Sequence, residues 1–197
     1  MLPNSQLYVQ DYRYLPNLCE LKTDAERCSG YPSLKYHYEK NTIYDNLKKD
    51  KKLQKTLRII NRAGMEPYFH QTGDLAGTEL NGLTLFASVD EKIPNNFLDD
   101  ISLFRAQTFL KSYTLNGVAT IQYIVENGTS VYNTRSGDNP IFCVVRQSNY
   151  TLGGDERRDT EITINGVGRV VKEINCTNGT IIVLDNIGTA AYVNGTY

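Results

Sequence analysis

Side chains that could carry out catalysis are few in this sequence, and they do not form a recognisable constellation. The chain of 197 residues has two histidines, His37 and His70, which lie far apart in sequence. Asp99 and Asp100 are adjacent, and neighbouring side chains on a helix point about 100° apart, so this pair does not converge on one substrate. We expect the two carboxylates to begin a helix instead, where the helix dipole favours negative charge.

Motifs for phosphate binding and for an activated serine lack their required context. Gly153 and Gly154 have neither the strand-loop-helix setting nor the lysine of a phosphate-binding loop. No serine lies in a G-x-S-x-G sequence. We therefore predict a protein that is not an enzyme, with no cofactor and no metal ion.

The four cysteines, Cys19, Cys28, Cys143 and Cys176, show no C-x-x-C spacing. A structural zinc site is therefore not expected. Cys19 and Cys28 are a candidate disulfide, which would close a small loop in an oxidising environment. In a cytosolic protein the same residues are expected to be free thiols.

Charge and hydropathy exclude two classes of partner. The formal net charge is -1, which provides no basic field for nucleic acid. No apolar segment reaches the length needed to cross a bilayer, so membrane insertion is not expected. The length suits one domain with an extension, and we place an N-terminal arm at residues 1–40 and the domain at residues 41–197.

Two features of the sequence point to different cellular compartments. The start, MLPNSQLYVQ, lacks the basic flank and apolar core of a secretory signal, which favours synthesis in the cytosol. Five N-x-[ST] sequons favour a secreted protein that carries glycans. They begin at Asn127, Asn149, Asn175, Asn178 and Asn194. Asn-Gly turns followed by threonine also create sequons by chance, so both readings stay open.

The arm is rich in tyrosine, with Tyr8, Tyr12 and Tyr14 in its first part. Disordered tails are usually poor in aromatic residues. Tyrosine rings can be buried while their hydroxyls stay in water, so these three are candidate contacts with a partner protein.

Helical signals follow the arm. Thr42 and Asp45 have the spacing of a capping box, which predicts a helix that begins there. Leu53, Leu57 and Ile60 recur at helical spacing before Gly64, which predicts a second helix with a glycine stop. Apolar residues between positions 97 and 115 predict one or two further short helices.

Strands dominate the rest of the pattern. Residues 84–89 read as a buried strand, and Asp90 is expected to cap the turn or helix that follows it. Period-two alternation predicts strands at 119–125, 141–145, 162–164, 170–171 and 181–184. Residues 152–159 are polar and predict an exposed hairpin loop. Helices first and strands later indicate an α+β fold, with N-terminal helices packed on mainly antiparallel β-sheets.

Two stretches, TLFASVD at 84–90 and NGTIIVLD at 178–185, resemble the two signature motifs of the fasciclin family. Ser88 and Val89 stand where that family usually has proline and threonine. Tyr113 is followed by Thr114 where the family often has histidine, so no role of that histidine carries over. The matching positions, which we expect to be structural, are Thr84, Leu85, Phe86, Ala87, Asp90, Asn178, Gly179, Ile182, Leu184 and Asp185.

The resemblance implies a fasciclin-like domain over residues 41–193. Most members of that family are non-enzymatic adhesion modules that bind proteins or glycans outside the cell. Together with the absence of a signal, it leads us to expect a structural protein that makes protein-protein contacts in a larger assembly, such as a minor capsid component in the virion of a large DNA virus. The alternative is a secreted or cell-surface adhesion domain that binds an extracellular protein or glycan.

Overall fold

A seven-stranded sheet and the helices that cover it make up the part of the chain described by the computed structural model, residues 41–70, 82–137, 139–152 and 155–187. The helices are α4 (Ile43–Lys49), α5 (Gln54–Ala63), α6 (Glu66–His70), the 3-10 turn η2 (Asp90–Lys92), α7 (Asn95–Asp100), α8 (Leu103–Ser112) and α9 (Ile121–Asn127). The strands are β1 (Leu83–Ser88), β2 (Thr114–Asn116), β3 (Ser130–Tyr132), β4 (Ile141–Leu152), β5 (Asp155–Ile164), β6 (Gly168–Cys176) and β7 (Gly179–Leu184). Among these elements no helix is long and apolar enough to cross a bilayer.

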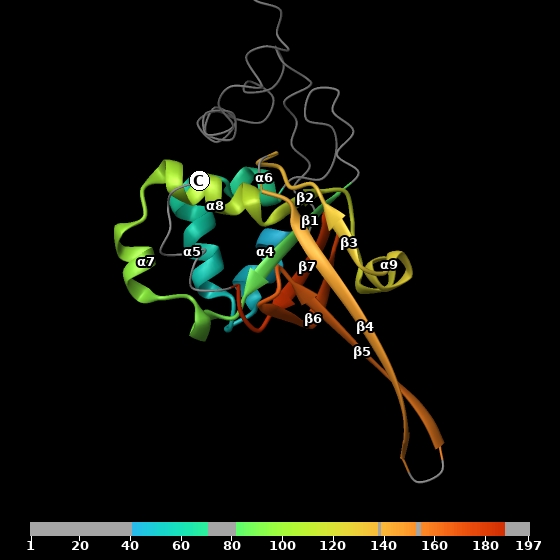
Figure 1. Cartoon of the computed structure of the whole chain (residues 1–197). Coiled ribbons are helices and arrows are strands. Elements are labelled where there is room, and N and C mark those ends of the chain that lie inside the picture. The colour runs from blue at the N-terminus through green and yellow to red at the C-terminus, as the bar shows by residue number, and fades with distance from the viewer. Residues whose placement is uncertain (1–40, 71–81, 138, 153–154, 188–197) are drawn as a thin grey trace, which may run out of the picture.

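The strand order is β2-β1-β7-β6-β5-β4-β3. Neighbouring strands are antiparallel except for β1 and β7, which run parallel. The predicted α+β class with a mainly antiparallel sheet is therefore confirmed. Figure 1 shows α4, α5, α7 and α8 on one side of the molecule, while α9 lies near the other end of the sheet, against β4.

The core is centred on the parallel pair of β1 and β7. Phe86 is the register partner of Ile182, and all six residues of β1 are buried. The two stretches that resemble the signature motifs therefore meet in one interior. Strands buried on both faces carry continuous apolar runs, which is the pattern of LTLFAS and TIIVL.

Helix ends follow the predicted capping signals in part. The Thr42 hydroxyl accepts from the Asp45 backbone N–H, and the Asp45 carboxylate accepts from the Thr42 N–H, which confirms the capping box. Gly64 ends α5 with φ of 64°, a left-handed conformation that glycine adopts without strain.

Asp90 caps a helix other than the one expected. Its carboxylate accepts hydrogen bonds from the backbone N–H groups of Gln54 (2.9 Å) and Lys55 (2.7 Å) at the start of α5. The residue at the N-cap of α5, Leu53, makes no side-chain cap. The carboxylate at the end of β1 therefore supplies the missing acceptor and ties α5 to the sheet.

Asn178 joins three elements at the other end of the parallel pair. Its side-chain oxygen accepts from the Ile43 N–H at 2.8 Å, and its amide donates to the Phe69 carbonyl at 2.9 Å. Its own backbone carbonyl accepts from the Leu83 N–H at 3.0 Å. The side chain therefore links the start of α4 to the end of α6, and the backbone of the same residue holds the start of β1.

The predicted strand at residues 119–125 is wrong, because this segment forms α9. Thr120 caps the Tyr123 N–H, and Gly128 stops the helix with φ of 66°. Ile121, Ile124 and Val125, which are buried or half-buried, also have helical spacing. A segment this short fits both periods, and the cap and the glycine decide between them.

The predicted hairpin at residues 152–159 is confirmed, but its loop is shorter than expected. Leu152 ends β4, and Asp155 begins β5 as its register partner, so polar residues continue as strand almost to the tip. Only residues 153–154 stand between the two strands, and they lie outside the described residues.

The Asn178→Ala substitution should lower the free energy of unfolding by about 2–5 kcal/mol, because the buried Ile43 N–H and Phe69 C=O would both lose a partner. Urea denaturation measures this. The exposed Asn175 lies in the same turn region, and Asn175→Ala should change stability by less than about 0.5 kcal/mol. Equal effects of the two substitutions would contradict the role given to Asn178.

Candidate interaction surface

The most prominent feature of the surface is a two-stranded ribbon formed by the outer parts of β4 and β5. The strands stay in register from Cys143 and Ile164 to Leu152 and Asp155. Strand β3 pairs with β4 only as far as Cys143, and β6 pairs with β5 only from Thr163. The ribbon therefore projects beyond the body of the domain, as Figure 1 shows.

The ribbon is anchored at its base, and beyond the base the side chains that the structure describes are exposed. Cys143, Ile162 and Ile164 are buried where it joins the body. Beyond them, the side chains of residues 146–149 and 158–161 are exposed, and Leu152 near the tip is 55% exposed. An isolated two-stranded hairpin is marginally stable in water, so a ribbon of this length gains from a contact that covers it.

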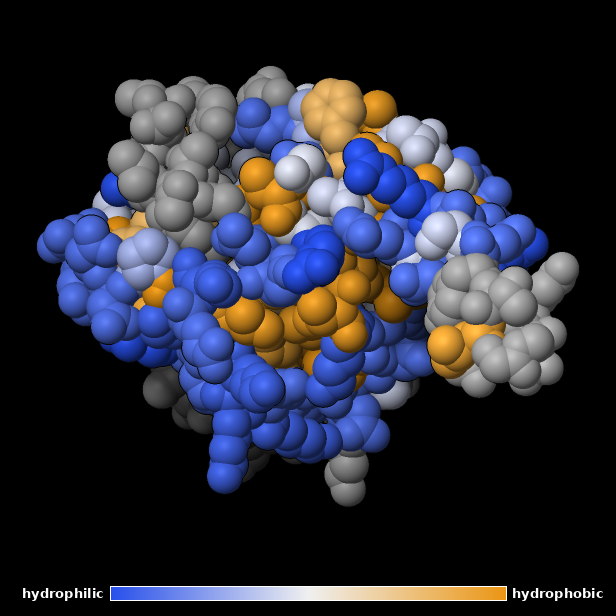
Figure 2. Space-filling view, turned by 60° about the horizontal axis from the view of Figure 1, so that its bottom comes forward, coloured by the Kyte–Doolittle hydropathy of each residue, from blue (hydrophilic) through white to orange (hydrophobic). Residues whose placement is uncertain are grey.

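The outer face of the sheet at the base of the ribbon is partly apolar. Val131 and Phe142 are register partners and are 57% and 52% exposed. The space-filling view in Figure 2 shows hydrophobic residues gathered in the middle of one face, between hydrophilic ones. Contiguous exposed apolar patches with polar residues around them are typical of protein-binding surfaces.

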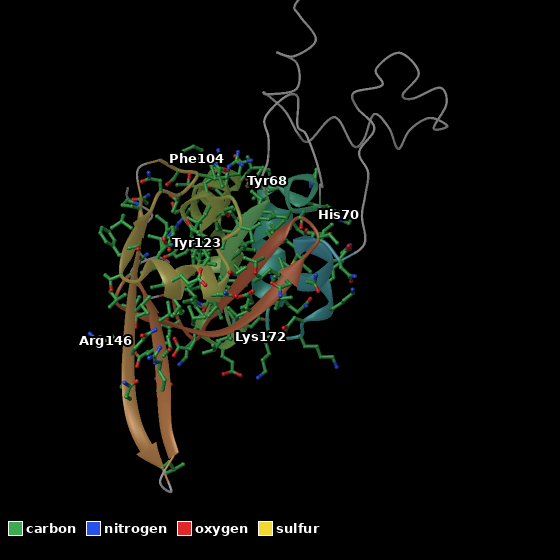
Figure 3. The ribbon with its side chains drawn as sticks, turned by 90° about the vertical axis from the view of Figure 1, so that its right-hand side faces the viewer. Tyr68, His70, Phe104, Tyr123, Arg146 and Lys172 are labelled. Atoms are coloured by element: carbon green, nitrogen blue, oxygen red, sulfur yellow. The ribbon has the colours of Figure 1, made fainter. Side chains whose placement is uncertain are left out.

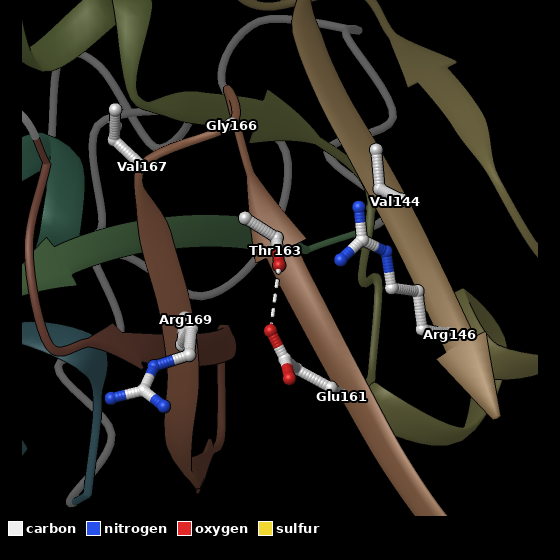
Figure 4. A pocket seen from close by; sticks show the side chains of 7 residues that line it. All are labelled: Val144, Arg146, Glu161, Thr163, Gly166, Val167 and Arg169. Atoms are coloured by element: carbon white, nitrogen blue, oxygen red, sulfur yellow. Dashed lines mark hydrogen bonds between the residues drawn. The ribbon is translucent and has the colours of Figure 1, made fainter. Parts of the chain in front are cut away.

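A shallow depression of about 310 Å³ lies on β4, β5, β6 and the turn between the last two. Its lining residues are Val144, Arg146, Glu161, Thr163, Gly166, Val167 and Arg169. Figure 4 shows Arg146 and Arg169 on either side of Glu161, whose carboxylate accepts from the Thr163 hydroxyl at 3.4 Å. Arg169 is also paired with Asp185 at 3.0 Å. The mixed charge suits contact with a polar protein surface better than capture of a free anion.

One arrangement resembles a hydrolytic triad in composition but not in geometry. Thr42 Oγ1 lies 2.9 Å from His70 Nδ1, and Asp45 Oδ2 lies 3.9 Å from the same nitrogen. A triad places the carboxylate and the nucleophile on opposite nitrogens of the ring. The Thr42 side chain is buried and caps α4, so the group serves the helix terminus.

The described thiols are protected by burial. Desolvation raises the pKa of Cys143 to about 12 and that of Cys176 to about 11. The reactive form of cysteine is the thiolate, which is scarce at neutral pH for both residues. Within the described residues, His, Cys, Asp and Glu do not gather in groups of three or more that could hold a metal ion.

The residues of the first sequence motif lie in or beside β1. Leu85, Phe86 and Ala87 are each 1% exposed. The Thr84 hydroxyl donates to the Gly117 carbonyl at 2.8 Å and accepts from the Ala119 N–H at 2.7 Å. Thr84 of the motif therefore lies in the sheet and also holds the segment that follows β2 in place.

The second motif has a similar position in and around β7. A side chain on Gly179 would overlap the Leu83 carbonyl, and its φ of 150° also favours glycine. Ile182 and Leu184 are buried. Asp185 accepts from the Arg169 N–H at 2.8 Å and so closes the end of the β6–β7 hairpin.

The sequons differ in accessibility. Asn127, Asn149 and Asn175 are exposed. Asn178 is 6% exposed and its amide is engaged with Phe69, so this fold has no room for a glycan there. Asn194 lies outside the described residues.

Several candidate residues of the arm also lie outside the described residues: Tyr8, Tyr12, Tyr14, Cys19, Cys28 and His37. His70 and the Asp99–Asp100 pair do not come together. His70 ends α6, and Asp99 and Asp100 are exposed at the end of α7 instead of at its start.

Sequence reasoning missed the ribbon, because polar residues around Gly153 and Gly154 looked like a loop. The signal that could have revealed the ribbon is the pairing register of the two strands. If Cys143 pairs with Ile164, continued antiparallel pairing places Leu152 opposite Asp155 and leaves two glycines for a tight turn.

No protein-family model and no curated protein matches this sequence. The fold, however, is similar to that of a FAS1 domain pair from the insect cell adhesion molecule fasciclin I. The TM-score is 0.56 at 17% sequence identity, and the match covers 78% of this chain and 53% of the other. This chain therefore spans about half of that domain pair. The similarity establishes a fasciclin-type fold, as the two motifs predicted.

Alkylation should be slow at both described thiols, because their high pKa values keep the thiolate scarce at neutral pH. We expect iodoacetamide at pH 7.5 to leave Cys143 unlabelled in the folded protein and to label it in urea. Peptide mass mapping measures both. Rapid labelling of native Cys143 would contradict its burial and reopen a reactive role.

Proposed function

We propose that this protein is a non-enzymatic interaction module that makes protein-protein contacts in a larger assembly. The observation that carries the proposal is the projecting β4–β5 ribbon, which has exposed side chains and two long edges that no other described strand pairs with. Sheet edges with unpaired backbone groups are common binding sites for other proteins. The fasciclin-type fold supports the proposal, since the similar domain pair belongs to a cell adhesion molecule.

The roles of the polar residues support a non-enzymatic module. Asp90 and Asn178 are engaged with backbone groups that join helices to the sheet, and Thr42 caps its own helix, α4. The two described cysteines have raised pKa values. The exposed positions of the ribbon and of the outer sheet face then remain as the surface that a partner meets.

We propose that the protein is a minor capsid component of a large DNA virus, whose particles assemble inside cells. Cys143 and Cys176 are free thiols, which the reducing cytosol favours, and this supports the intracellular setting. The second candidate is an extracellular adhesion domain. It is favoured by the exposed sequons at Asn127, Asn149 and Asn175 and by the adhesion protein that shares the fold.

Intact mass measurement of the protein from its native source separates the two settings. The cytosolic setting predicts the unmodified polypeptide mass with four free thiols. Added hexose-containing mass, or the loss of two hydrogens for a Cys19–Cys28 bridge, would instead establish the extracellular setting. In that case we expect glycans at the exposed sequons and none at Asn178, whose amide is buried.

The assembly role is tested by shortening the ribbon. Arg146 and Glu161 are register partners, so replacing residues 147–160 by Asn-Gly should close a tight hairpin at the base. We expect this variant to keep its fold, because the buried residues at the base stay in place, and to be lost from the native assembly. Co-purification with the assembly and circular dichroism measure the two effects.

Deletion of residues 1–38 is the companion variant, because the arm is the other candidate contact. It should also leave a folded domain that no longer joins the assembly. Normal incorporation of both shortened proteins would contradict the proposed function.

A further inference from the structure

The two strands of the ribbon differ in charge. Strand β4, IFCVVRQSNYTL, contains one charged residue, Arg146. Strand β5, DERRDTEITI, is charged at Asp155, Glu156, Arg157, Arg158, Asp159 and Glu161. Charged residues on an edge strand discourage pairing with another chain. The β5 edge is therefore protected against pairing, and the β4 edge is not.

Along this uncharged edge, backbone groups of β4 beyond Cys143 are not paired with another strand within the described residues. The Phe142 carbonyl accepts from the Asn165 N–H at 2.8 Å, so the Phe142 backbone faces the β5 side. Backbone groups alternate in direction along a strand, so those of Gln147, Asn149 and Thr151 point away from β5. No described strand pairs with β4 on that side beyond Cys143.

We propose that the β4 edge, residues 147–151, pairs antiparallel with the same edge of a second copy of this chain. The two ribbons would then form one four-stranded sheet. The inference deepens the proposed function, on which it rests, by naming the partner of the ribbon.

The edge is complementary to itself. With a two-fold axis at Asn149, Gln147 lies opposite Thr151 of the second copy, and Asn149 lies opposite its own counterpart. Arg146, the one charged residue of β4, lies opposite Leu152 of the second copy, so no like charges meet. A two-fold contact of this kind closes on itself and yields a dimer instead of a fibre.

The geometry leaves space for a second copy. Figure 1 and Figure 3 both show the ribbon standing clear of the body, and in Figure 3 Arg146 lies on the opposite side of the molecule from His70. Pairing would also convert a two-stranded ribbon into a wider sheet, which is the more stable arrangement.

A matched pair of proline variants tests the proposal on the full-length purified protein. Gln147 and Thr160 are register partners, and the alternation places each N–H on an outer edge, β4 for Gln147 and β5 for Thr160. Proline removes the N–H at each position without breaking the ladder between the two strands. Sedimentation velocity over a concentration series measures the dimer.

The proposal predicts a concentration-dependent dimer for the unmodified chain. Gln147→Pro should raise its dissociation constant at least about tenfold, while Thr160→Pro should change it less than about twofold. A chain that stays monomeric at every soluble concentration would overturn the proposal, as would a dimer that responds equally to both prolines. If the chain stays monomeric, the partner of the β4 edge is instead a segment of another protein or of residues 1–40.

A second variant controls for the case in which proline distorts the strand locally. Asn149 is exposed, so Asn149→Lys should be tolerated in the monomer but would place two positive charges across the two-fold axis. The dimer should weaken at low salt and recover as salt screens the repulsion. A dimer unaffected by Asn149→Lys would overturn the proposal. Because these measurements use the purified chain alone, their failure is distinguishable from a failure to join the native assembly.

Discussion

Parallel pairing of β1 with β7 is the constraint on which the rest of the structure depends. The two strands lie far apart in the sequence, and every element from η2 to β6 is contained in the connection between them. Both ends of the pair are secured by residues of the two motifs. Asn178 and Gly179 fix the start of each strand against α4 and α6, and Asp90 ties the end of β1 to α5. Polar residues at these positions therefore stabilise a buried junction, as expected for motif positions that are structural.

Much of this centre could be predicted from the sequence, because continuous apolar runs, capping boxes and glycine stops act locally. The remaining parts depended on tertiary contacts. Asp90 lies beside the start of α5 only after β1 has entered the sheet, so its partner in capping could not be read from adjacent residues. Residues 121–127 fit a strand and a helix equally well until Thr120 and Gly128 are taken as cap and stop. The ribbon went unrecognised because its outer residues face water on both sides, which removes the hydrophobic alternation that usually identifies a strand.

The exposed ribbon and the buried core have different roles. Burial at Phe86 and Ile182 stabilises the domain, whereas the side chains of residues 146–149 and 158–161 are exposed and are available for recognition. The two ribbon edges differ in charge. The charged residues of β5 oppose pairing with another chain, so the proposed contact is made by the β4 edge. A fasciclin-type fold thus presents an uncharged strand edge at the end of a long hairpin, away from its helices.

Residue-resolved amide hydrogen exchange on the full-length chain tests this account most directly, because it reports the stable centre and the open edge in one experiment. We predict that the amides of Phe86 and Ile182 exchange only through global unfolding. The amides of Gln147 and Asn149 should exchange rapidly in dilute protein and slowly in concentrated protein, while that of Thr160 stays rapid at both concentrations. Slow exchange at Gln147 and Asn149 in dilute protein, or rapid exchange at Phe86 and Ile182, would contradict the account.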